Sequence, residues 1–504
     1  MKEGCNVVFF MCDQMSARAL SMWDPNNTNV PMPNIERLAR EGVTFMNAVC
    51  VVPFSSPSRA SFVTGMYPNT HGILTNINDD VEPLDPSIPT TEGELYKRGY
   101  TTGFFGKWHL GKLNNWECYR NSDGGWMDFK GYAELRKSKK HTAKPPRKNE
   151  VLARPNYDQG YGFYMDKYLY EKMQTAPNAQ IREKLMEVGR YGVPVELDNW
   201  TLCNEDGIAF IRANKDRPFM ATISLHPPHL PFAVQEPYFS RMQPEDVWFP
   251  PSAYDTELSD IFYNQLLISR HVGERGVRLR MRSYYTAMLY IDDMLGRVLK
   301  ALDDLKLADN TLLIFTSDHG DPIASHGMMF DKLLKNFIEE LTVTPTFMRL
   351  PGVIPAGLKV QAQFNSPDFA PTILDYLGCE IPSTMQGRSF RPIMEGREKD
   401  EVGFSIQMRP YARQIRGEID GKLYTYAKVF TVRQNRVLSE ELYNVTDDFY
   451  QQKNQIDNPE YKAIKERLIA EFNQFADRYG DRRMEELPSK GLLTTGNLTP
   501  ALMR

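Results

Sequence analysis

The side chains best equipped for chemistry stand in short clusters, each directly after a run of apolar residues. Four of them are oxygen or nitrogen donors that follow two such runs: Asp13, Gln14, Asp318 and His319. Carboxylate oxygens suit Ca²⁺ or Mg²⁺, and a histidine ligand keeps Mn²⁺ as an alternative. An aspartate at the end of a strand often only caps a helix, but two such pairs on one sheet edge favour a divalent-metal site.

A second cluster surrounds Ser55 in the string SSPSRASFVTG, residues 55–65. Pro57 suits the first turn of a helix, and a serine before it suits the N-cap. We therefore expect Ser55 at the positive end of a helix, where an anion or developing negative charge is stabilised. A capped helix without any chemistry is the alternative explanation of this string.

Histidines and lysines gather in the same places. The chain has eight histidines, and five lie in or beside these clusters: His109, His226, His229, His319 and His326. Lys107 and Lys332 add positive charge for an oxyanion. Packing alone explains such a concentration poorly.

The elements that must position these residues follow from the apolar runs at 6–12, 101–105, 218–225 and 311–316. Continuous apolar runs bounded by polar turns are typical of strands in a parallel sheet covered on both faces. A helical apolar pattern over 284–305 precedes the last run, and alternating strands and helices indicate a doubly wound α/β sheet. Ligands bind beyond the carboxyl ends of such strands, so we expect the polar clusters to converge there.

The end of the chain has a different pattern. Residues 402–408, 414–419 and 422–430 predict strands, with a hairpin turn at Asp420-Gly421. An apolar face over 461–479 predicts a closing helix. We therefore predict a catalytic domain at 1–385 and a smaller α+β subdomain, an antiparallel sheet plus a helix, at 386–504.

Composition excludes several classes of protein. The chain has 504 residues with 60 Lys+Arg, 64 Asp+Glu and a net charge of −4, which argues against nucleic-acid binding by bulk charge. Hydrophobic residues at 41% and charged residues at 25% are ordinary for a soluble globular protein, so disorder is excluded. No apolar run approaches the ~18 residues that span a membrane, so no membrane partner is expected.

The expected location is the cytoplasm. The opening residues show no signal peptide, and the six scattered cysteines are interpreted as reduced thiols. The periplasm is the alternative if an export signal has been removed ahead of Met1.

The combination of motifs resembles the serine-type, formylglycine-dependent sulfatases of the alkaline phosphatase superfamily. The resemblance covers most of the chain, in segments that include NVVFFMCDQ, SSPSRASFVTGMYPNTHG, GYTTGFFGKWHLG, HPPHLPF, DNTLLIFTSDHGD, SHGMMFDK and ELYNVTDD. It implies a divalent metal, most often Ca²⁺, held by the four donors of the first cluster. It also implies that a maturase oxidises Ser55 to formylglycine and that Arg59 supports this residue.

The resemblance further implies roles for the basic side chains. Lys107, His229 and Lys332 are expected to hold the sulfate oxygens, and His229 to protonate the leaving alcohol. His109 is expected to bond the hydrated aldehyde and help to expel sulfate. The implied activity is a sulfuric ester hydrolase acting on a small-molecule or oligosaccharide sulfate ester, with a sulfated carbohydrate as the favoured substrate.

Two alternatives stay open. Gln14 and His319 stand where many sulfatases have Asp and Asn, and these variants also occur in related phosphonate monoester and phosphodiester hydrolases. A non-catalytic anion- or glycan-binding protein is the alternative from another class, which the complete set of ligands and acid/base groups disfavours.

A basic insertion follows His109. Its charges are Arg136, Lys137, Lys139, Lys140, Lys144, Arg147 and Lys148. A solvated loop is one interpretation, and attraction of an anionic glycan by long-range steering is the other. Nucleic acid is not expected as a partner, because no aromatic residue is interleaved in the run.

Overall fold

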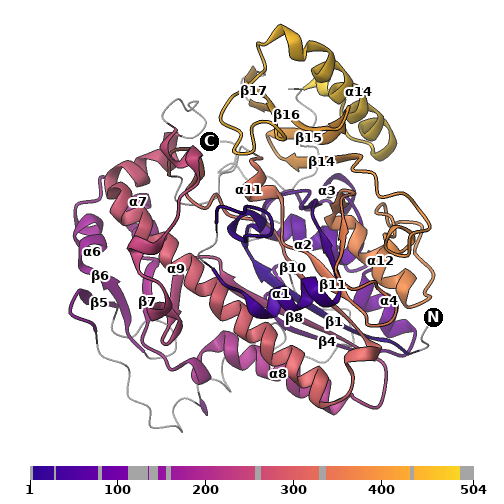
Figure 1. Cartoon of the computed structure of the whole chain (residues 1–504), viewed down its shortest axis with the longest axis horizontal. Coiled ribbons are helices and arrows are strands. Elements are labelled where there is room, and N and C mark those ends of the chain that lie inside the picture. Colours follow the sequence, from indigo (N-terminus) through magenta and orange to yellow (C-terminus); the bar gives the residue numbers. More distant parts are fainter. Residues whose placement is uncertain are drawn as a thin grey trace.

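The computed structural model describes residues 4–27, 30–77, 82–111, 134–135, 146–154, 161–255, 263–328, 337–431 and 436–487. Lys332 and the basic residues 136–144 therefore lie outside the described residues. The centre of the molecule is a seven-stranded sheet in the order β12-β2-β11-β10-β1-β8-β4 (Figure 1). Its strands are β1 (Asn6–Asp13), β2 (Val43–Phe45), β4 (Thr101–Gly106), β8 (Phe219–Pro228), β10 (Thr311–Ser317), β11 (Phe347–Arg349) and β12 (Leu358–Val360).

The four predicted strands form a parallel block at the centre and one side of this sheet, which confirms the expected α/β architecture. β1 pairs in parallel with β10 on one side and with β8 on the other, and β4 pairs in parallel with β8. Cys12 stands opposite Ser317 in the register. The residues that follow these two positions therefore leave the sheet at the same carboxyl edge.

Helices cover both faces of the sheet, and β1 shows why, because its side chains alternate between the two faces. Val8 and Phe10 pack into the core with helices α1 (Pro33–Glu41), α8 (Asn199–Ala213) and α9 (Tyr263–Asp304). Val7 and Phe9 pack on the other side with helices α2 (Ser55–Thr64), α4 (Thr91–Lys97) and α12 (Phe369–Tyr376). The predicted helix over 284–305 is the second half of α9.

A small second sheet was not predicted from the sequence. Its order is β5-β6-β7-β9, with strands β5 (Glu150–Arg154), β6 (Phe163–Asp166), β7 (Val188–Tyr191) and β9 (Phe232–Gln235). Helices α6 (Lys167–Gln174) and α7 (Ala179–Leu185) lie within the same stretch of chain. In Figure 1 this group lies to the left of the central sheet, beside helix α9.

The remaining short elements are β3 (Ala48–Val49), β13 (Phe364–Asn365), α3 (Pro68–His71), α10 (Ser325–Met328), α11 (Glu339–Thr342) and α13 (Arg391–Met394).

The C-terminal part is an antiparallel sheet with one helix, as predicted. Its strands are β14 (Phe404–Arg409), β15 (Ala412–Ile419), β16 (Lys422–Thr431) and β17 (Arg436–Asn444), and its helix is α14 (Lys462–Tyr479). The predicted hairpin turns at Asp420 and Gly421, whose φ angles of 51° and 76° suit such a turn. β17 was missed. The division of the chain at residue 385 stays a prediction.

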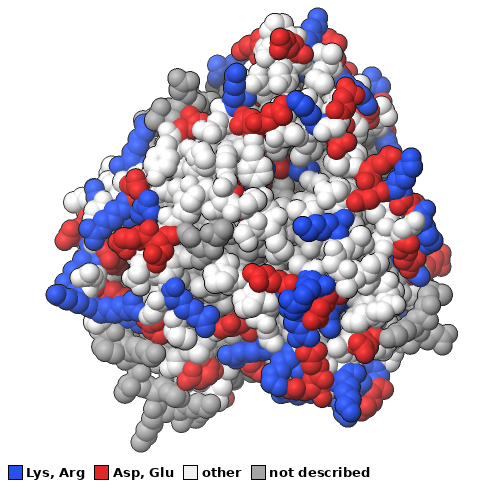
Figure 2. Space-filling model, in the orientation of Figure 1, with Lys and Arg blue, Asp and Glu red and all other residues white. Residues whose placement is uncertain are grey.

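Charged side chains of both signs lie on the surface of the molecule. The face drawn in Figure 2 carries basic and acidic side chains interspersed, without one continuous area of a single sign. None of the helices in the described part is long and apolar enough to cross a membrane.

A buried ion-pair network joins the C-terminal sheet to the central one. Glu339 accepts hydrogen bonds from Arg416 of β15 at 2.8 and 3.0 Å. Arg18, which follows β1, lies 3.4 Å from the same carboxylate. Burial alone would raise the pKa of Glu339, but Arg416 and Arg18 hold it below its ordinary value of 4.5. The carboxylate therefore stays ionised and links the two parts of the chain.

We predict that Glu339→Gln destabilises the protein by about 3 kcal/mol, because it leaves two guanidinium groups buried without their anion. Thermal unfolding should show a loss of roughly 3 °C in midpoint at neutral pH. Since the pKa of Glu339 is depressed, its stabilisation is present above pH 4.5 and is lost as the pH falls further, so the difference should shrink there. Asp304→Asn, which removes the exposed partner of Lys300, serves as control and should change little.

Candidate functional site

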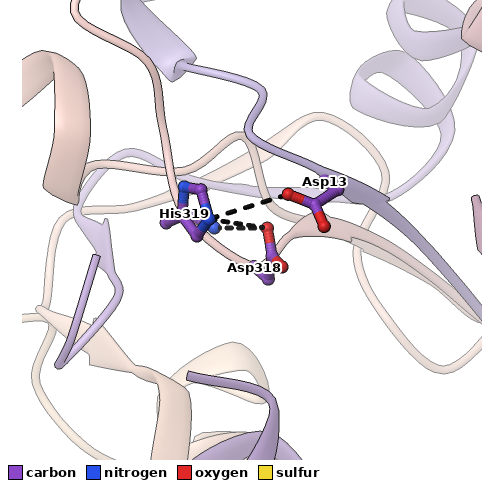
Figure 3. A group of neighbouring side chains, drawn as sticks. All are labelled: Asp13, Asp318 and His319. Atoms are coloured by element: carbon purple, nitrogen blue, oxygen red, sulfur yellow. Dashed lines mark hydrogen bonds and ion pairs between the residues drawn. The ribbon is translucent and has the colours of Figure 1, made fainter. Parts of the chain in front are cut away.

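Three side chains converge at the carboxyl edge of the central sheet (Figure 3). Asp13 ends β1, and Asp318 and His319 directly follow β10. One ligand atom from each lies within 4.8 Å of the other two. His319 Nε2 is 3.6 Å from Asp13 Oδ1 and 3.7 Å from Asp318 Oδ1, and all three residues are fully buried. The predicted convergence of the two strand ends is therefore what the structure shows.

The donor atoms of this cluster fit a divalent cation. His319 Nδ1 lies 2.9 Å from the carbonyl oxygen of Gly320, which can only accept, so this nitrogen carries the hydrogen. Nε2 then turns its lone pair toward the two carboxylates, as in a metal-bound imidazole. Asp13 Oδ1 is buried and has no hydrogen-bond partner within the described part of the chain. A cation between these atoms would satisfy both.

Gln14 lies beside the cluster, as predicted. Its backbone N–H donates to Asp318 Oδ1 at 3.1 Å, and its φ of 69° is the left-handed conformation that non-glycine residues rarely adopt. Its side-chain amide donates to Asp321 Oδ2 at 2.7 Å, and Asp321 is also paired with the buried Arg280. This bond leaves the carbonyl oxygen as the ligand atom that Gln14 can offer a cation.

Ser55 is the first residue of α2, so its predicted place at the positive end of a helix is confirmed. The predicted serine N-cap is wrong. The N-cap is Phe54, whose carbonyl accepts from Ser58 N–H at 3.1 Å and whose side chain makes no cap bond. The neighbouring hydroxyl of Ser56 instead donates to the His109 carbonyl at 2.7 Å.

The hydroxyl of Ser55 points into the cluster. Its Oγ lies 3.2 Å from His319 Nε2, 3.4 Å from Lys107 Nζ and 3.5 Å from Asp13 Oδ2. The residue is 1% exposed. A metal ligand, a carboxylate and a cation thus surround one helix-terminal oxygen, which suits a nucleophile.

Arg59 and Lys107 hold the carboxylates in place. Arg59 stands one turn after Ser55 and donates to Asp318 Oδ2 at 2.9 Å and to Asp13 Oδ2 at 3.3 Å. It also donates to the Lys107 carbonyl and to Ser224 Oγ, both at 2.7 Å. Lys107 Nζ forms an ion pair with Asp13 Oδ2. Burial alone would raise the pKa of Asp13, but Lys107, His229 and Arg59 hold it well below its usual range.

Three histidines border this cluster. His229 Nδ1 donates to the Leu230 carbonyl at 2.7 Å. His226, whose ring centre is 4.5 Å from that of His229, stacks on Trp200 and brings Nδ1 to 4.0 Å from Asp13 Oδ2. His109 has a φ of 61°, and burial together with Lys107 lowers its pKa to about 3. These three imidazoles line the side of the cluster formed by the ends of β4 and β8.

The structure therefore brings together every predicted site residue that it describes. Lys332 lies outside the described residues. The sequence analysis assigned no role to four supporting residues, although it placed one of them, His226, beside the clusters: Ser224, His226, Arg280 and Asp321. His226 and Asp321 stand in the quoted strings HPPHLPF and TSDHGD, which were the available signal, whereas nothing near Arg280 in the sequence points to the site.

Comparisons with known proteins identify the family of the chain. The model of the Sulfatase family matches residues 5–379, and that of the N-sulphoglucosamine sulphohydrolase C-terminal region matches residues 325–478. An ulvan-active sulfatase of Formosa agariphila is 27% identical over 94% of this chain and 82% of the relative. An N-acetylglucosamine-6-O-sulfatase of Bacteroides thetaiotaomicron is 26% identical over 78% of this chain and 71% of the relative.

Solved structures share the fold. A phosphonate monoester hydrolase from Silicibacter pomeroyi superposes with a TM-score of 0.73 at 19% identity, over 96% of this chain and 97% of that one. A protein solved in complex with its substrate D-glucosamine-2-N,6-O-disulfate superposes with a TM-score of 0.67 at 19% identity, over 96% and 100% of the two chains.

Proposed function

This chain belongs to the sulfatase family, and on that premise we propose that it hydrolyses sulfate esters of carbohydrates at the cluster around Asp13 and Ser55. The observation that carries the proposal is the placement of Ser55 Oγ within 3.5 Å of Asp13, Lys107 and His319 atoms. Relatives named for ulvan and for N-acetylglucosamine 6-sulfate support a carbohydrate substrate. The similarity to the ulvan-active relative extends over 94% of this chain, which supports the same class.

In this proposal the cation is held by Asp13, Gln14, Asp318 and His319. Two carboxylates, an amide oxygen and a neutral imidazole suit Ca²⁺, with Mn²⁺ and Mg²⁺ as the alternatives. When bound, the metal would neutralise negative charge on the transferring sulfuryl group. The protein contributes the orientation of the donors, since Arg59 holds both carboxylates and the Gly320 carbonyl orients His319.

We assign Ser55 as the residue that a separate maturase converts to formylglycine. A sulfate ester of plain serine can be released only by a second attack on sulfur, whereas the hydrated aldehyde would supply both an oxygen nucleophile and a second hydroxyl. Cysteine is the commoner residue at this position in the family. Conversion of Ser55 therefore requires a host whose maturase accepts serine. Arg59 supports this position from the next turn of α2.

Sulfate binding and proton transfer are assigned to the basic side chains of the site. Lys107 Nζ, 3.4 Å from Ser55 Oγ, is placed to hold an oxygen of the sulfate group, and Lys332 is assigned the same task. His109 is assigned to take the proton that allows sulfate to leave. His229 has its Nδ1–H fixed by the Leu230 carbonyl, so in the imidazolium form its Nε2–H is the group that gives a proton to the leaving alcohol.

We predict that His229→Ala lowers turnover of sulfate esters by ~10²–10⁴-fold, the usual contribution of a positioned acid. Because the loss is that of a proton donor, a sugar sulfate with a poor leaving group should suffer more than an activated aryl sulfate. Steady-state rates on both substrates measure this split. His271→Ala is the matched control, since His271 Nε2 bonds the Lys172 carbonyl away from the cluster, and its rates should stay unchanged. Equal, small losses on both substrates would contradict the assignment.

Phosphonate monoester hydrolysis is the second candidate, favoured by Gln14 and His319 in the metal cluster. The test is the ratio of kcat/KM for an aryl sulfate to that for a phenyl phosphonate monoester, measured on protein whose formylglycine content is known. We expect the sulfate ester to be the better substrate, because Lys107 and His109 stand in an intact GKWHLG string. A reversed ratio would favour the phosphonate reaction on the same site.

A further inference from the structure

A cavity with a volume of about 690 Å³ lies between α9, the start of β5 and the short helical turn at Pro244–Asp246. None of the metal-cluster residues lines it. Five basic side chains do: Arg147, Lys148, Arg275, Arg278 and Arg282. On the face drawn in Figure 2, basic and acidic side chains alternate along the left margin, where Figure 1 places β5 and α6.

Helix α9 presents different faces to this cavity and to the metal cluster. Arg275, Arg278 and Arg282 follow the i, i+3, i+7 spacing of one helix face, and all three line the cavity. Arg280 and Tyr284, each two positions from Arg282 and so about 200° around the helix, face the cluster. Arg280 pairs with Asp321, and Tyr284 donates to the Gln14 carbonyl at 2.9 Å.

Arg282 is the unusual member of this set. It is only 8% exposed, and its guanidinium makes no hydrogen bond or ion pair with the described residues. One face of the guanidinium lies over the Phe239 ring at 3.9 Å, so its donor edge remains for another partner. Burial lowers its pKa to about 10, which leaves it charged at neutral pH. A buried cation without an anion is costly, and a bound oxyanion would remove that cost.

The carboxylates at the cavity are mostly engaged elsewhere. Glu150 accepts two bonds from Arg190 at 3.0 and 2.6 Å. Glu274 pairs with Arg278 at 2.8 Å. Asp166 caps α6 through the Tyr168 N–H at 2.9 Å. Glu245 and Glu274 are exposed, and of these two Glu274 is the one that pairs with Arg278. These acids therefore leave Arg282 without a direct partner while limiting the excess positive charge in the cavity.

We propose that this cavity is a second binding site for a sulfate group, distinct from the catalytic cluster. The fork of guanidinium donors matches two oxygens of an oxyanion. Five basic against four acidic lining side chains leave an excess of one positive charge, which suits an oxyanion. The volume suits a small saccharide. The ligand class rests on the proposed function, whereas the site rests on its own geometry.

Anomalous scattering of selenate, which has the shape and charge of sulfate, locates the site directly. Crystals of the full chain soaked in sodium selenate should show a peak within hydrogen-bond distance of the Arg282 guanidinium. The peak should vanish in Arg282→Met, which keeps the stem packed on Phe239. It should persist in Arg241→Met, the matched control, because Arg241 also stacks on an aromatic ring but does not line the cavity. No peak at Arg282 in the wild-type protein overturns the proposal.

Titration calorimetry then separates the two sources of a sulfate group. A compact polysulfated sugar, sucrose octasulfate, and inorganic sulfate are compared on wild type, Arg282→Met and the exposed double variant Lys148→Gln/Arg275→Gln. Loss of a charged hydrogen bond weakens binding by about tenfold or more. If only the octasulfate is weakened, the site takes a sulfated saccharide, and if inorganic sulfate is weakened, it takes the free ion. Unchanged affinity for both probes in Arg282→Met overturns the proposal.

Turnover of a monosulfated aryl ester keeps this inference apart from the proposed function. That rate should be unchanged in Arg282→Met, because Arg282 touches neither the metal cluster nor Ser55. Protein that binds octasulfate through Arg282 but hydrolyses no sulfate ester would contradict the proposed function alone.

Discussion

Ser55→Ala is expected to abolish sulfate-ester hydrolysis, with a loss of about four orders of magnitude or more, in every expression host. The reason is that alanine offers neither the oxygen that lies at the centre of the cluster nor a group that a maturase can oxidise. The loss should appear in kcat with little change in folding, since the Ser55 hydroxyl contributes only bonds of 3.2–3.5 Å to the cluster. Steady-state kinetics on an aryl sulfate, with circular dichroism beside it, measures both.

The matched control lies on the same helix. Ser61→Ala also removes a buried hydroxyl from α2, but that hydroxyl bonds His71 Nε2 at 3.0 Å, away from the metal cluster. Its kcat should stay near the wild-type value. Mass spectrometry of the wild-type peptide should show Ser55 lighter by two hydrogens in active preparations. Full activity in protein shown to contain only unmodified serine would refute the formylglycine assignment and favour direct attack by the serine.

Asp13→Asn is expected to reduce both metal content and turnover, by at least about 10³-fold in kcat/KM. Asp13 supplies a cluster carboxylate and is also the counter-ion of Lys107 and Arg59. The neutral amide keeps the shape but removes the charge, so the cation is released and two buried basic groups lose their partner. Elemental analysis of the purified protein, with activity before and after chelation and Ca²⁺ or Mn²⁺ return, measures the effect.

Asp292→Asn is the control for loss of a buried carboxylate. Asp292 accepts from the backbone N–H groups of Asn34 and Ile35 at the start of α1, outside the metal cluster. This variant should lose stability but keep its metal and its kcat. An anomalous signal that places the bound metal away from Asp13, Asp318 and His319, with this cluster empty, would contradict the site.

The central strands could be predicted because they are buried on both faces and so appear as continuous apolar runs. β17 could not, because its sequence RVLSEELYN groups apolar and polar residues instead of alternating them, and it lies at the edge of a sheet. β5 to β7 are short strands, and β7 pairs with β9, which lies more than forty residues further along the chain, so no local pattern contains that information. Both β17 and the β5–β7 group become strands through pairing with other strands, which a local sequence pattern does not contain.

The cluster itself was predictable to the extent that parallel strands place their carboxyl ends at one edge. Asp13 and Asp318 meet because Cys12 and Ser317 are paired, a consequence of topology alone. The residues that support the cluster from outside, such as Arg280 and Asp321, were not predictable. Arg280 lies just before the apolar helical pattern over 284–305, and nothing in that pattern singles it out. Its pairing with Asp321 depends on how α9 packs across the sheet. The predicted serine N-cap was wrong, since the helix already starts at Ser55 after the N-cap Phe54, and the Ser56 hydroxyl bonds the His109 carbonyl instead.

The Glu339 network bears on how such a protein can be divided or recombined. Arg18 comes from the first strand's loop, Glu339 from the middle of the chain and Arg416 from the C-terminal sheet, so the buried charges balance only when all three segments are present. Val51 and Val52, a few residues before Ser55, also pack into the C-terminal core with Ile406. The segment that leads into helix α2 therefore has hydrophobic partners about 350 residues further along the chain. A chimera that exchanges the C-terminal sheet between relatives must carry the matching residues around 18, 51 and 339, or it would leave a buried charge without its partner.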